Sequence, residues 1–253
     1  MAQERFIAIG DIHGCHATLE ELLNTVEIGA RDTVVFLGDY VDRGPDTPGV
    51  LARLIAFGRA HEHCVFLRGN HDAMLLHFLG VAEPGFGGES FLLARNRGDT
   101  TLRQYGCPAA LIEPWLSTPA LPDAATRREM LSHIPPEHLA FLEDTRLMLA
   151  TPEYLFVHAG IRPGIALARQ TLEDVLWIRE DFIVLPHDLP QTVVYGHTPT
   201  NAEGFAIRWD RAGRKIGIDT GCVYHGALTA LLLPEGASVS VPCRDAVLER
   251  RRA

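Results

Sequence analysis

Five short polar motifs in this chain carry side chains of the types that bind metal ions. Each motif follows a short run of aliphatic and β-branched residues and contains glycine. The motifs are Gly10–Gly14 (GDIHG), Gly38–Gly44 (GDYVDRG), Arg68–Asp72 (RGNHD), Val157–Gly160 (VHAG) and Gly196–His197. Runs of this kind are typical of buried strands, and ligands gather where the carboxyl ends of such strands meet. The pattern therefore predicts one metal site built from five strand ends.

Two cations are predicted, because the motifs supply more ligands than one ion needs. The candidate ligands are Asp11, His13, Asp39, Asn70, His158 and His197. Following strand order, the first three hold one ion, and the last three hold a second ion together with Asp39. Asp39 can bridge both ions because a carboxylate has two oxygens. Oxygen and nitrogen ligands without thiolate suit Mn²⁺, Fe or Zn²⁺ better than Ca²⁺ or copper, and Mn²⁺ is our first choice.

Two such ions about 3.5–4 Å apart form a clamp for in-line displacement at phosphorus, with water between them as the nucleophile. No protein nucleophile is then required, and the sequence has neither a G-x-S-x-G elbow nor a Walker-type loop. His71 follows Asn70 directly and is the candidate general acid. Asp42, three residues after Asp39, is positioned to accept a hydrogen bond from this imidazole. Arg43 offers a planar guanidinium for phosphate oxygens.

Ordinary structural roles are the alternative for each of these residues. A single Asp after a strand is commonly a turn residue or a helix cap, and Gly-Asn and Asp-Arg-Gly are frequent turn sequences. We favour metal binding because several glycine-flanked motifs, all with ligand-type side chains, follow strands in the same way.

The predicted elements alternate between strand and helix at both ends of the chain. Predicted strands cover 6–9, 33–37, 64–67, 155–157, 192–195, 215–218 and 228–233, and the clearest helices cover 15–26, 48–58, 124–134 and 137–142. Strand-helix-strand repetition with short connections implies parallel pairing. Residues 1–253 are expected to form one domain, with a proline-broken helical insertion at about 80–150 and a polar tail at about 240–253. The insertion either overhangs the metal edge or forms a packing layer.

Composition narrows the classes of partner. The chain has 253 residues, 47% of them hydrophobic, and a formal net charge of −9, which disfavours general nucleic-acid binding. No segment approaches the roughly 20 apolar residues of a membrane span. The five cysteines, which lack a C-x-x-C pair, favour neither a disulfide framework nor a thiolate zinc site: Cys15, Cys64, Cys107, Cys222 and Cys243. Without an N-terminal signal pattern, we expect a cytoplasmic protein. The oligomeric state is not indicated.

The motifs resemble the signature of the phosphoprotein phosphatase family within the calcineurin-like metallophosphoesterases. The resemblance runs from Gly10 to about Leu233, is strongest to small bacterial and phage serine/threonine protein phosphatases, and is weakest in the proline-rich middle. It implies an α/β metallophosphatase fold, with a central β-sandwich flanked by helices, and a two-metal site with the ligands named above. It also implies that His71 and Asp42 act as an acid pair and that Arg43 grips the substrate phosphate.

The same resemblance suggests two more substrate-binding residues. A later arginine commonly joins the first in this family, and Arg179 is the candidate, with Arg162 as a weaker alternative. A surface ion pair is the ordinary explanation for Arg179. Tyr224 is similar to a tyrosine at the edge of the family's site, and a core position is the alternative for it.

These features predict a metal-dependent phosphomonoester hydrolase that acts on phosphoserine and phosphothreonine in phosphoproteins or phosphopeptides. Asp72 prompts an alternative, because many protein phosphatases have Glu here, whereas Asp resembles the diadenosine tetraphosphatases of the same superfamily. Those relatives usually lack a partner that matches Asp42, which favours the protein phosphatase. A second alternative is a non-catalytic metal-binding scaffold, and the complete set of ligands argues against it.

Overall fold

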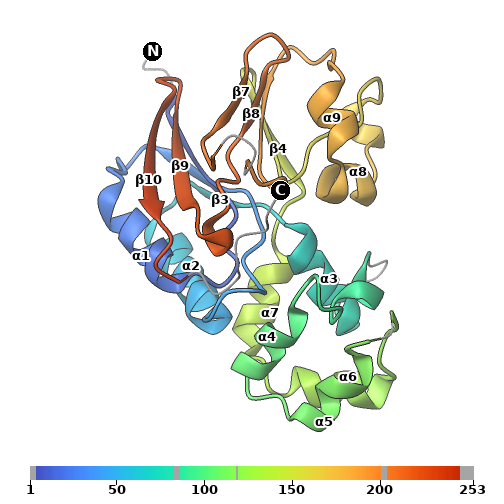
Figure 1. Cartoon of the computed structure of the whole chain (residues 1–253). Helices are drawn as coiled ribbons and strands as arrows, with labels where there is room; N and C mark the ends of the chain where they lie inside the picture. Colours follow the sequence, from blue (N-terminus) through green and yellow to red (C-terminus); the bar gives the residue numbers. More distant parts are fainter. Residues whose placement is uncertain (1–3, 83–85, 118, 201–203, 246–253) are drawn as a thin grey trace.

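The computed structural model of the chain describes residues 4–82, 86–117, 119–200 and 204–245. Two five-stranded sheets form its centre (Figure 1). The first has the order β10 (Ala237–Pro242), β9 (Ala227–Leu233), β1 (Phe6–Ile9), β2 (Thr33–Phe36) and β3 (Cys64–Phe66). The second has the order β4 (Met148–Ala150), β5 (Tyr154–Val157), β6 (Thr192–Tyr195), β8 (Lys215–Gly217) and β7 (Arg208–Asp210). The predicted α/β sandwich is confirmed.

Each sheet contains three neighbouring parallel strands, as the strand-helix-strand rhythm predicted. In the first sheet β1 pairs with β2 and β2 with β3 in parallel, and in the second β5, β6 and β8 do the same. Antiparallel strands flank both sets: β9 and β10 in the first sheet, β4 and β7 in the second. The five predicted motifs therefore follow the carboxyl ends of β1, β2, β3, β5 and β6.

Helices cover the outer faces of the sandwich (Figure 1). The helices are α1 (His16–Thr25), α2 (Thr47–Ala60), α3 (Asn70–Phe78), α4 (Gly98–Gln104), α5 (Ala109–Ile112), α6 (Ala124–Leu131), α7 (Pro136–Glu143), α8 (Leu172–Trp177) and α9 (Glu180–Val184). Of these, α4 to α7 lie together at one end of the molecule rather than on a face of a sheet (Figure 1). The helices α1 and α2 pack on the first sheet, and α8 and α9 pack on the second. In the described part of the chain, no helix is both long and apolar enough to cross a membrane.

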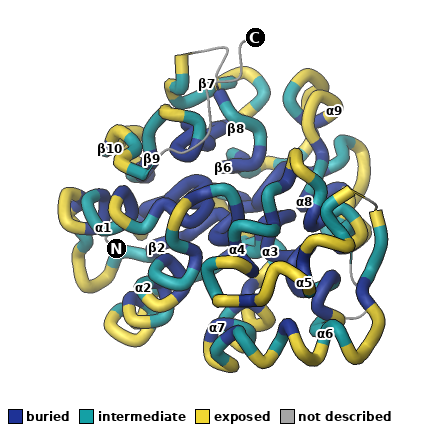
Figure 2. The backbone as a smooth tube through the Cα atoms, turned by 60° about the horizontal axis from the view of Figure 1, so that its bottom comes forward, coloured by how far each residue is buried: buried dark blue, intermediate teal, exposed yellow. Residues whose placement is uncertain are grey.

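Burial on both faces explains why these strands read as continuous apolar runs. Along β1, Ile7 and Ile9 pack toward α1 and α2, while Phe6 and Ala8 pack between the two sheets. Figure 2 shows buried positions gathered in the middle of the molecule and exposed positions on the outer turns of helices such as α6. The polar motifs thus begin at the points where buried apolar strands end.

The middle segment is helical, as predicted, but it ends in a strand. Helices α4 to α7 occupy it, with α4 against α2 and α7 against both α2 and α3, whereas residues 148–150 form β4 of the second sheet. The predicted polar tail begins inside β10, and Arg244 beyond it forms an ion pair with Glu21 at 2.7 Å. Residues 246–253 of that tail lie outside the described residues. The single-domain division stays a prediction.

Candidate active site

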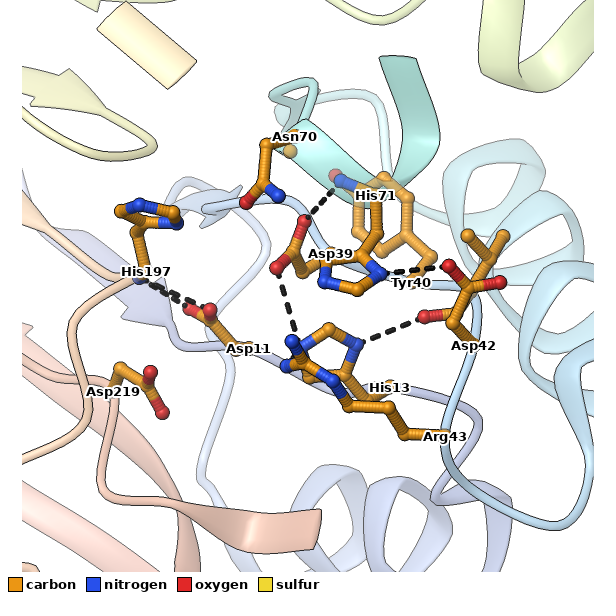
Figure 3. A network of polar contacts seen from close by, with 12 residues as sticks. Asp11, His13, Asp39, Tyr40, Asp42, Arg43, Asn70, His71, His197 and Asp219 are labelled. Atoms are coloured by element: carbon orange, nitrogen blue, oxygen red, sulfur yellow. Dashed lines mark hydrogen bonds and ion pairs between the residues drawn. The ribbon is translucent and has the colours of Figure 1, made fainter. Parts of the chain in front are cut away.

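The motifs meet in one buried cluster centred on Asp39 (Figure 3). The six candidate ligands are each at most 4% exposed: Asp11, His13, Asp39, Asn70, His158 and His197. Oδ2 of Asp39 lies 3.2 Å from Nε2 of His13, and Oδ1 lies 3.5 Å from Nε2 of His158. The two oxygens of one carboxylate thus face two different ligand groups, which is the arrangement of a shared ligand.

Hydrogen bonds to backbone carbonyls orient two of the imidazoles. Nδ1 of His13 lies 2.9 Å from the Val41 oxygen, and Nδ1 of His158 lies 2.8 Å from the Leu37 oxygen. A carbonyl can only accept, so each Nδ1 carries the proton and each Nε2 keeps its lone pair. Metal-binding histidines are commonly held in this way by their outer nitrogen.

The atoms around His158 fit a cation. Burial lowers the pKa of His158, so its ring stays neutral, and its Nε2 lone pair faces Asn70 Oδ1 at 3.0 Å and the Asp39 carboxylate. Nε2 of His197 is buried and has no hydrogen-bond partner among the described residues. Ligand atoms of Asp39, His158 and His197 lie within 4.8 Å of one another. Several lone pairs therefore converge without a proton between them, and a divalent ion satisfies this arrangement.

A second group of ligand atoms includes His71 in addition to predicted ligands. Atoms of His13, Asp39 and His71 lie within 4.8 Å of one another. The Asp11 carboxylate instead accepts hydrogen bonds from the backbone N–H of His197, at 3.0 and 3.2 Å. Burial, followed by repulsion from neighbouring carboxylates, raises the pKa of Asp11 well above its usual value. A cation beside it would relieve both effects.

His71 is tied to Asp42 on the side of the cluster away from His197 (Figure 3). Nδ1 of His71 lies 2.7 Å from Oδ2 of Asp42. The other Asp42 oxygen accepts a hydrogen bond from the Thr101 hydroxyl at 2.6 Å, and this hydroxyl accepts the Asp42 N–H at 2.9 Å. Burial lowers the pKa of His71 and raises that of Asp42, so the site favours the neutral form of each group. Thr101 of α4 thus joins His71 and Asp42 in one hydrogen-bonded group.

Backbone strain is concentrated in the same loops. Five non-glycine residues of the cluster have a positive φ: His13 (47°), Asp39 (55°), Asp42 (71°), Arg43 (69°) and His197 (62°). Each such conformation costs on the order of 1–3 kcal/mol and persists only where the surroundings enforce it. Gly69 permits part of this packing, because a Cβ there would lie 2.1 Å from the Asp39 nitrogen. The loops are thus held in shapes that stability alone does not favour.

Asp72 binds backbone rather than the open side of the site. Its carboxylate accepts the N–H groups of Asp39 at 2.9 Å, Tyr40 at 3.0 Å and Gly69 at 2.8 Å. The side chain is fully buried, and burial raises its pKa to about 7. Asp72 therefore joins the loop after β2 to the start of α3, and its identity does not report directly on the substrate.

A cavity of about 490 Å³ opens beside the ligand cluster. Its lining combines cationic and aromatic side chains: Arg43, Arg95, Arg179, Trp177, Phe205 and Tyr224, with Asn96, His197, Thr198 and Pro199. The Arg43 guanidinium lies 5.5 Å above the centre of the Tyr224 ring. Nη1 of Arg179 donates to the His197 carbonyl at 3.0 Å. The three candidate substrate residues thus line one cavity.

The alternative arginine lies elsewhere. Nε of Arg162 forms an ion pair with Asp174 at 2.6 Å, and its Nη1 forms another with Asp181 at 3.2 Å. It is not part of the cavity lining. Its partners give Arg162 a structural role between α8 and α9.

Sequence reasoning missed several residues of this region. Asp219 is 5% exposed and sits close to Asp11 (Figure 3). It follows the predicted strand at 215–218, so the strand-end rule that found Asp11 and Asp39 would have found it too. No comparable signal marks Thr101 or Arg95, because both lie in the segment that resembles the family least.

A family model described as calcineurin-like phosphoesterase matches residues 4–225. This chain belongs to the calcineurin-like phosphoesterase family. The dinuclear metal centre of this family agrees with the two ligand groups that share Asp39. The identity of the metal, for which the sequence favoured manganese, stays a prediction.

Several relatives of this chain are named bis(5′-nucleosyl)-tetraphosphatases. The chain is 27% identical to the bis(5′-nucleosyl)-tetraphosphatase PrpE (asymmetrical) of Halalkalibacterium halodurans, over 98% of this chain and 97% of that protein. It is 32% identical to the symmetrical bis(5′-nucleosyl)-tetraphosphatase of Nitrosomonas europaea, over 93% and 97%. A crystal structure described provisionally as a diadenosine tetraphosphatase superposes with a TM-score of 0.64 at 27% identity, covering 95% of this chain and 94% of that one.

These comparisons correct the sequence-based function. The expected serine/threonine protein phosphatase with phosphoprotein substrates is wrong, since these relatives, similar over nearly the whole chain, are named tetraphosphatases. A cold-active protein tyrosine phosphatase is similar at 15% identity and a TM-score of 0.55, which shows a shared fold alone. The physical reason for the error is that the five motifs describe the metal and phosphate side of the site. The side chains that face the rest of a substrate come from other segments.

Proposed function

We propose that this chain hydrolyses dinucleoside polyphosphates of the diadenosine tetraphosphate type at a two-metal centre. The observation that carries the proposal is the lining of the cavity beside the ligand cluster. Three arginines, at positions 43, 95 and 179, suit the oxygens of a phosphate chain. Three aromatic side chains, at positions 177, 205 and 224, suit the faces of nucleobases. The names of the relatives point to the same class of substrate.

Two divalent ions, Mn²⁺ in this proposal, would be held by the predicted ligands Asp11, His13, Asp39, Asn70, His158 and His197. When bound, such ions supply charge neutralisation at the phosphoryl group and a water of lowered pKa. The lowered pKa values of His158 and His197, which keep both rings neutral, and the raised pKa of Asp11 support this assignment.

His71 would donate its Nε2 proton to the leaving phosphate oxygen while its Nδ1 takes the proton of the neutral Asp42 carboxyl, a contribution of typically 10²–10⁴-fold. Asp42 would hold the imidazole through the 2.7 Å contact, and Thr101 would hold Asp42. Arg43 and Arg179 would orient the phosphate chain over the cluster. The cation–π contact with Tyr224 and the 2.6 Å contact with Nε2 of His13 would position the Arg43 guanidinium.

Product analysis tests the proposal. With Mn²⁺ supplied, kcat/KM for diadenosine tetraphosphate should exceed that for a phosphoserine peptide by at least about 100-fold, because the dinucleotide offers a phosphate chain for the arginines and nucleobases for the aromatic side chains of the cavity. Chromatography of the products also distinguishes symmetrical cleavage to two ADP from asymmetrical cleavage to ATP and AMP. Faster turnover of the peptide, or no turnover of either substrate, would contradict the proposal.

A matched pair of variants tests the acid. His71→Asn should lower kcat by about 10²–10⁴-fold while the bound metal stays near two ions per chain. His63→Asn changes the same residue type at an exposed position and should leave kcat unchanged. Undiminished turnover in His71→Asn would remove this residue from the mechanism.

A further inference from the structure

Three cysteines that are far apart in the sequence meet behind the active site. Sγ of Cys222 lies 3.0 Å from Sγ of Cys243, which lies 3.7 Å from Sγ of Cys15. All three sulfur atoms lie within 4.8 Å of one another, and none is in a disulfide. The spacing in the sequence favoured no thiolate site, but the packing of α1, η5 and the end of β10 places the three sulfur atoms side by side.

The backbone holds this group in place. Cys15 directly precedes α1, and Cys222 begins the short 3₁₀ helix η5 (Cys222–Tyr224). Cys243 directly follows β10, where its N–H donates to the Gly226 carbonyl at 3.0 Å. The Thr18 hydroxyl lies 3.7 Å from Sγ of Cys243 and accepts the next backbone N–H at 2.8 Å. Cys222 therefore lies in a short helix, and Cys15 and Cys243 are each directly next to the end of a regular element.

We propose that Cys15, Cys222 and Cys243 bind one thiophilic divalent cation of the Zn²⁺ class, outside the catalytic centre. Tetrahedral Zn²⁺ with bonds of about 2.3 Å sets sulfur atoms roughly 3.8 Å apart. The observed separation of 3.7 Å is close to that value, and the 3.0 Å separation must widen slightly as the ion binds. Three thiolates select soft cations over the hard cations that oxygen ligands prefer. The thiol protons leave as the ion binds.

The exposure of the three residues gives the ion a route. Cys15 and Cys222 are 0% and 2% exposed, while Cys243 is half-buried. The ion therefore enters past Cys243, and solvent on that side supplies the fourth ligand.

Such an ion would link two segments that also contribute residues to the active site. Cys15 is two residues from His13, and Cys222 is two residues from Tyr224. Bound metal would join both to the strand end at Cys243, so the site should resist unfolding when it is filled.

Cobalt provides a specific probe for this site. The enzyme is purified with a phosphine reductant and its catalytic centre is saturated with Mn²⁺ before Co²⁺ is added. A thiolate-to-Co²⁺ charge-transfer band in the near ultraviolet should grow to one equivalent and disappear when one equivalent of Zn²⁺ is added. The oxygen and nitrogen ligands of the catalytic centre cannot give this band.

Cysteine variants separate the outcomes. Cys243→Ser, at the half-buried position, should abolish the band and the rise in unfolding temperature caused by Zn²⁺, whereas Cys107→Ser should keep both. Phosphate-ester hydrolysis is not needed for either readout. No band in the wild type, a band that survives Cys243→Ser, or only three titratable thiols with a mass two hydrogens lower would overturn the proposal, the last in favour of a disulfide.

Discussion

At the scale of single residues, the identity of a side chain in a motif can depend on the backbone groups that it binds inside the protein. Asp72 was the one residue that pointed toward a nucleotide substrate, yet its carboxylate accepts three backbone N–H groups below the site. A buried acceptor with three donors is structurally demanding, because each donor left unpaired costs about 1–3 kcal/mol. Asp72 is thus a residue that this chain shares with a group of relatives, and it does not contact the substrate in our interpretation.

Asp72→Glu tests this distinction. The longer side chain must fit a fully buried position, so we expect the free energy of unfolding to fall by about 1–3 kcal/mol. The ratio of kcat/KM for diadenosine tetraphosphate to that for a phosphopeptide should stay within about twofold, because the carboxylate does not line the cavity. Denaturant titration and paired kinetics measure the two effects. Asp144→Glu, at an exposed position, is the control, and a changed substrate ratio in Asp72→Glu alone would refute our interpretation.

At the scale of elements, the helical middle segment contributes to the site itself. α4 places Thr101 against Asp42, and the loop before it brings Arg95 and Asn96 to the cavity. The sequence left open whether this segment overhangs the metal edge or only packs. The contacts of Thr101 with Asp42 favour direct participation of the segment in the site. Among the described residues, α4 is the one helix of the segment that contacts the acid pair.

Thr101→Val measures that participation. Valine has nearly the same shape but leaves one Asp42 oxygen and the Asp42 N–H without their partner, so His71 is held less well. We expect kcat to fall about tenfold, equivalent to about 1.4 kcal/mol, with little change in KM and a shifted acid limb of the pH–rate profile. Thr100→Val, whose hydroxyl bonds to the Arg97 carbonyl, should be close to wild type. Equal effects of the two changes would point to general damage to α4.

His138 of α7 should make stability depend on pH. It is 6% exposed, its Nδ1 lies 2.8 Å from the Tyr105 hydroxyl, and burial lowers its pKa. The unfolded chain takes up a proton near pH 6.5, whereas the folded chain resists it, so the free energy of unfolding falls as the pH drops below about 6.5. In denaturant titrations from pH 8 to pH 5.5, His138→Gln should lose less stability than the wild type. Parallel curves would show that His138 does not contribute.

At the scale of the whole molecule, the two sheets deliver metal ligands while distant segments build the substrate side. The cavity draws its lining from the middle segment, from α8 and from the loops around residues 198–205 and 224. Among the described residues, the cavity lining holds three arginines and no acidic side chain, on a chain with a net charge of −9. Under the proposed function, this local positive charge would attract a polyanionic substrate.

Arg95→Ala tests whether the cavity binds the part of the substrate that lies away from the reacting phosphate. Arg95 is exposed on the cavity rim, so its loss should raise KM for diadenosine tetraphosphate about tenfold, which corresponds to about 1.4 kcal/mol. KM for the small ester p-nitrophenyl phosphate should change less than about twofold. Arg128→Ala, an exposed position on α6, is the control. A matching rise in KM for both substrates would show that Arg95 acts on the reacting phosphate instead.

The sequence by itself predicted seven of the ten strands in the described part of the chain and the parallel pairing among them. Two strands, Phe6–Ile9 and Thr192–Tyr195, have the predicted bounds, because runs of apolar residues ended by glycine are a local signal. The edge strands β4, β7 and β10 were missed, since half-exposed strands carry weaker patterns.

The tertiary structure alone decided what surrounds the metal ligands. Thr101 reaches Asp42 across 59 positions, and Cys15 reaches Cys243 across 228. Asp219 and the cavity arginines are likewise placed by packing between segments. Motifs report what one strand end offers, whereas substrate choice depends on side chains that become neighbours only when both sheets and the helices around them have packed together.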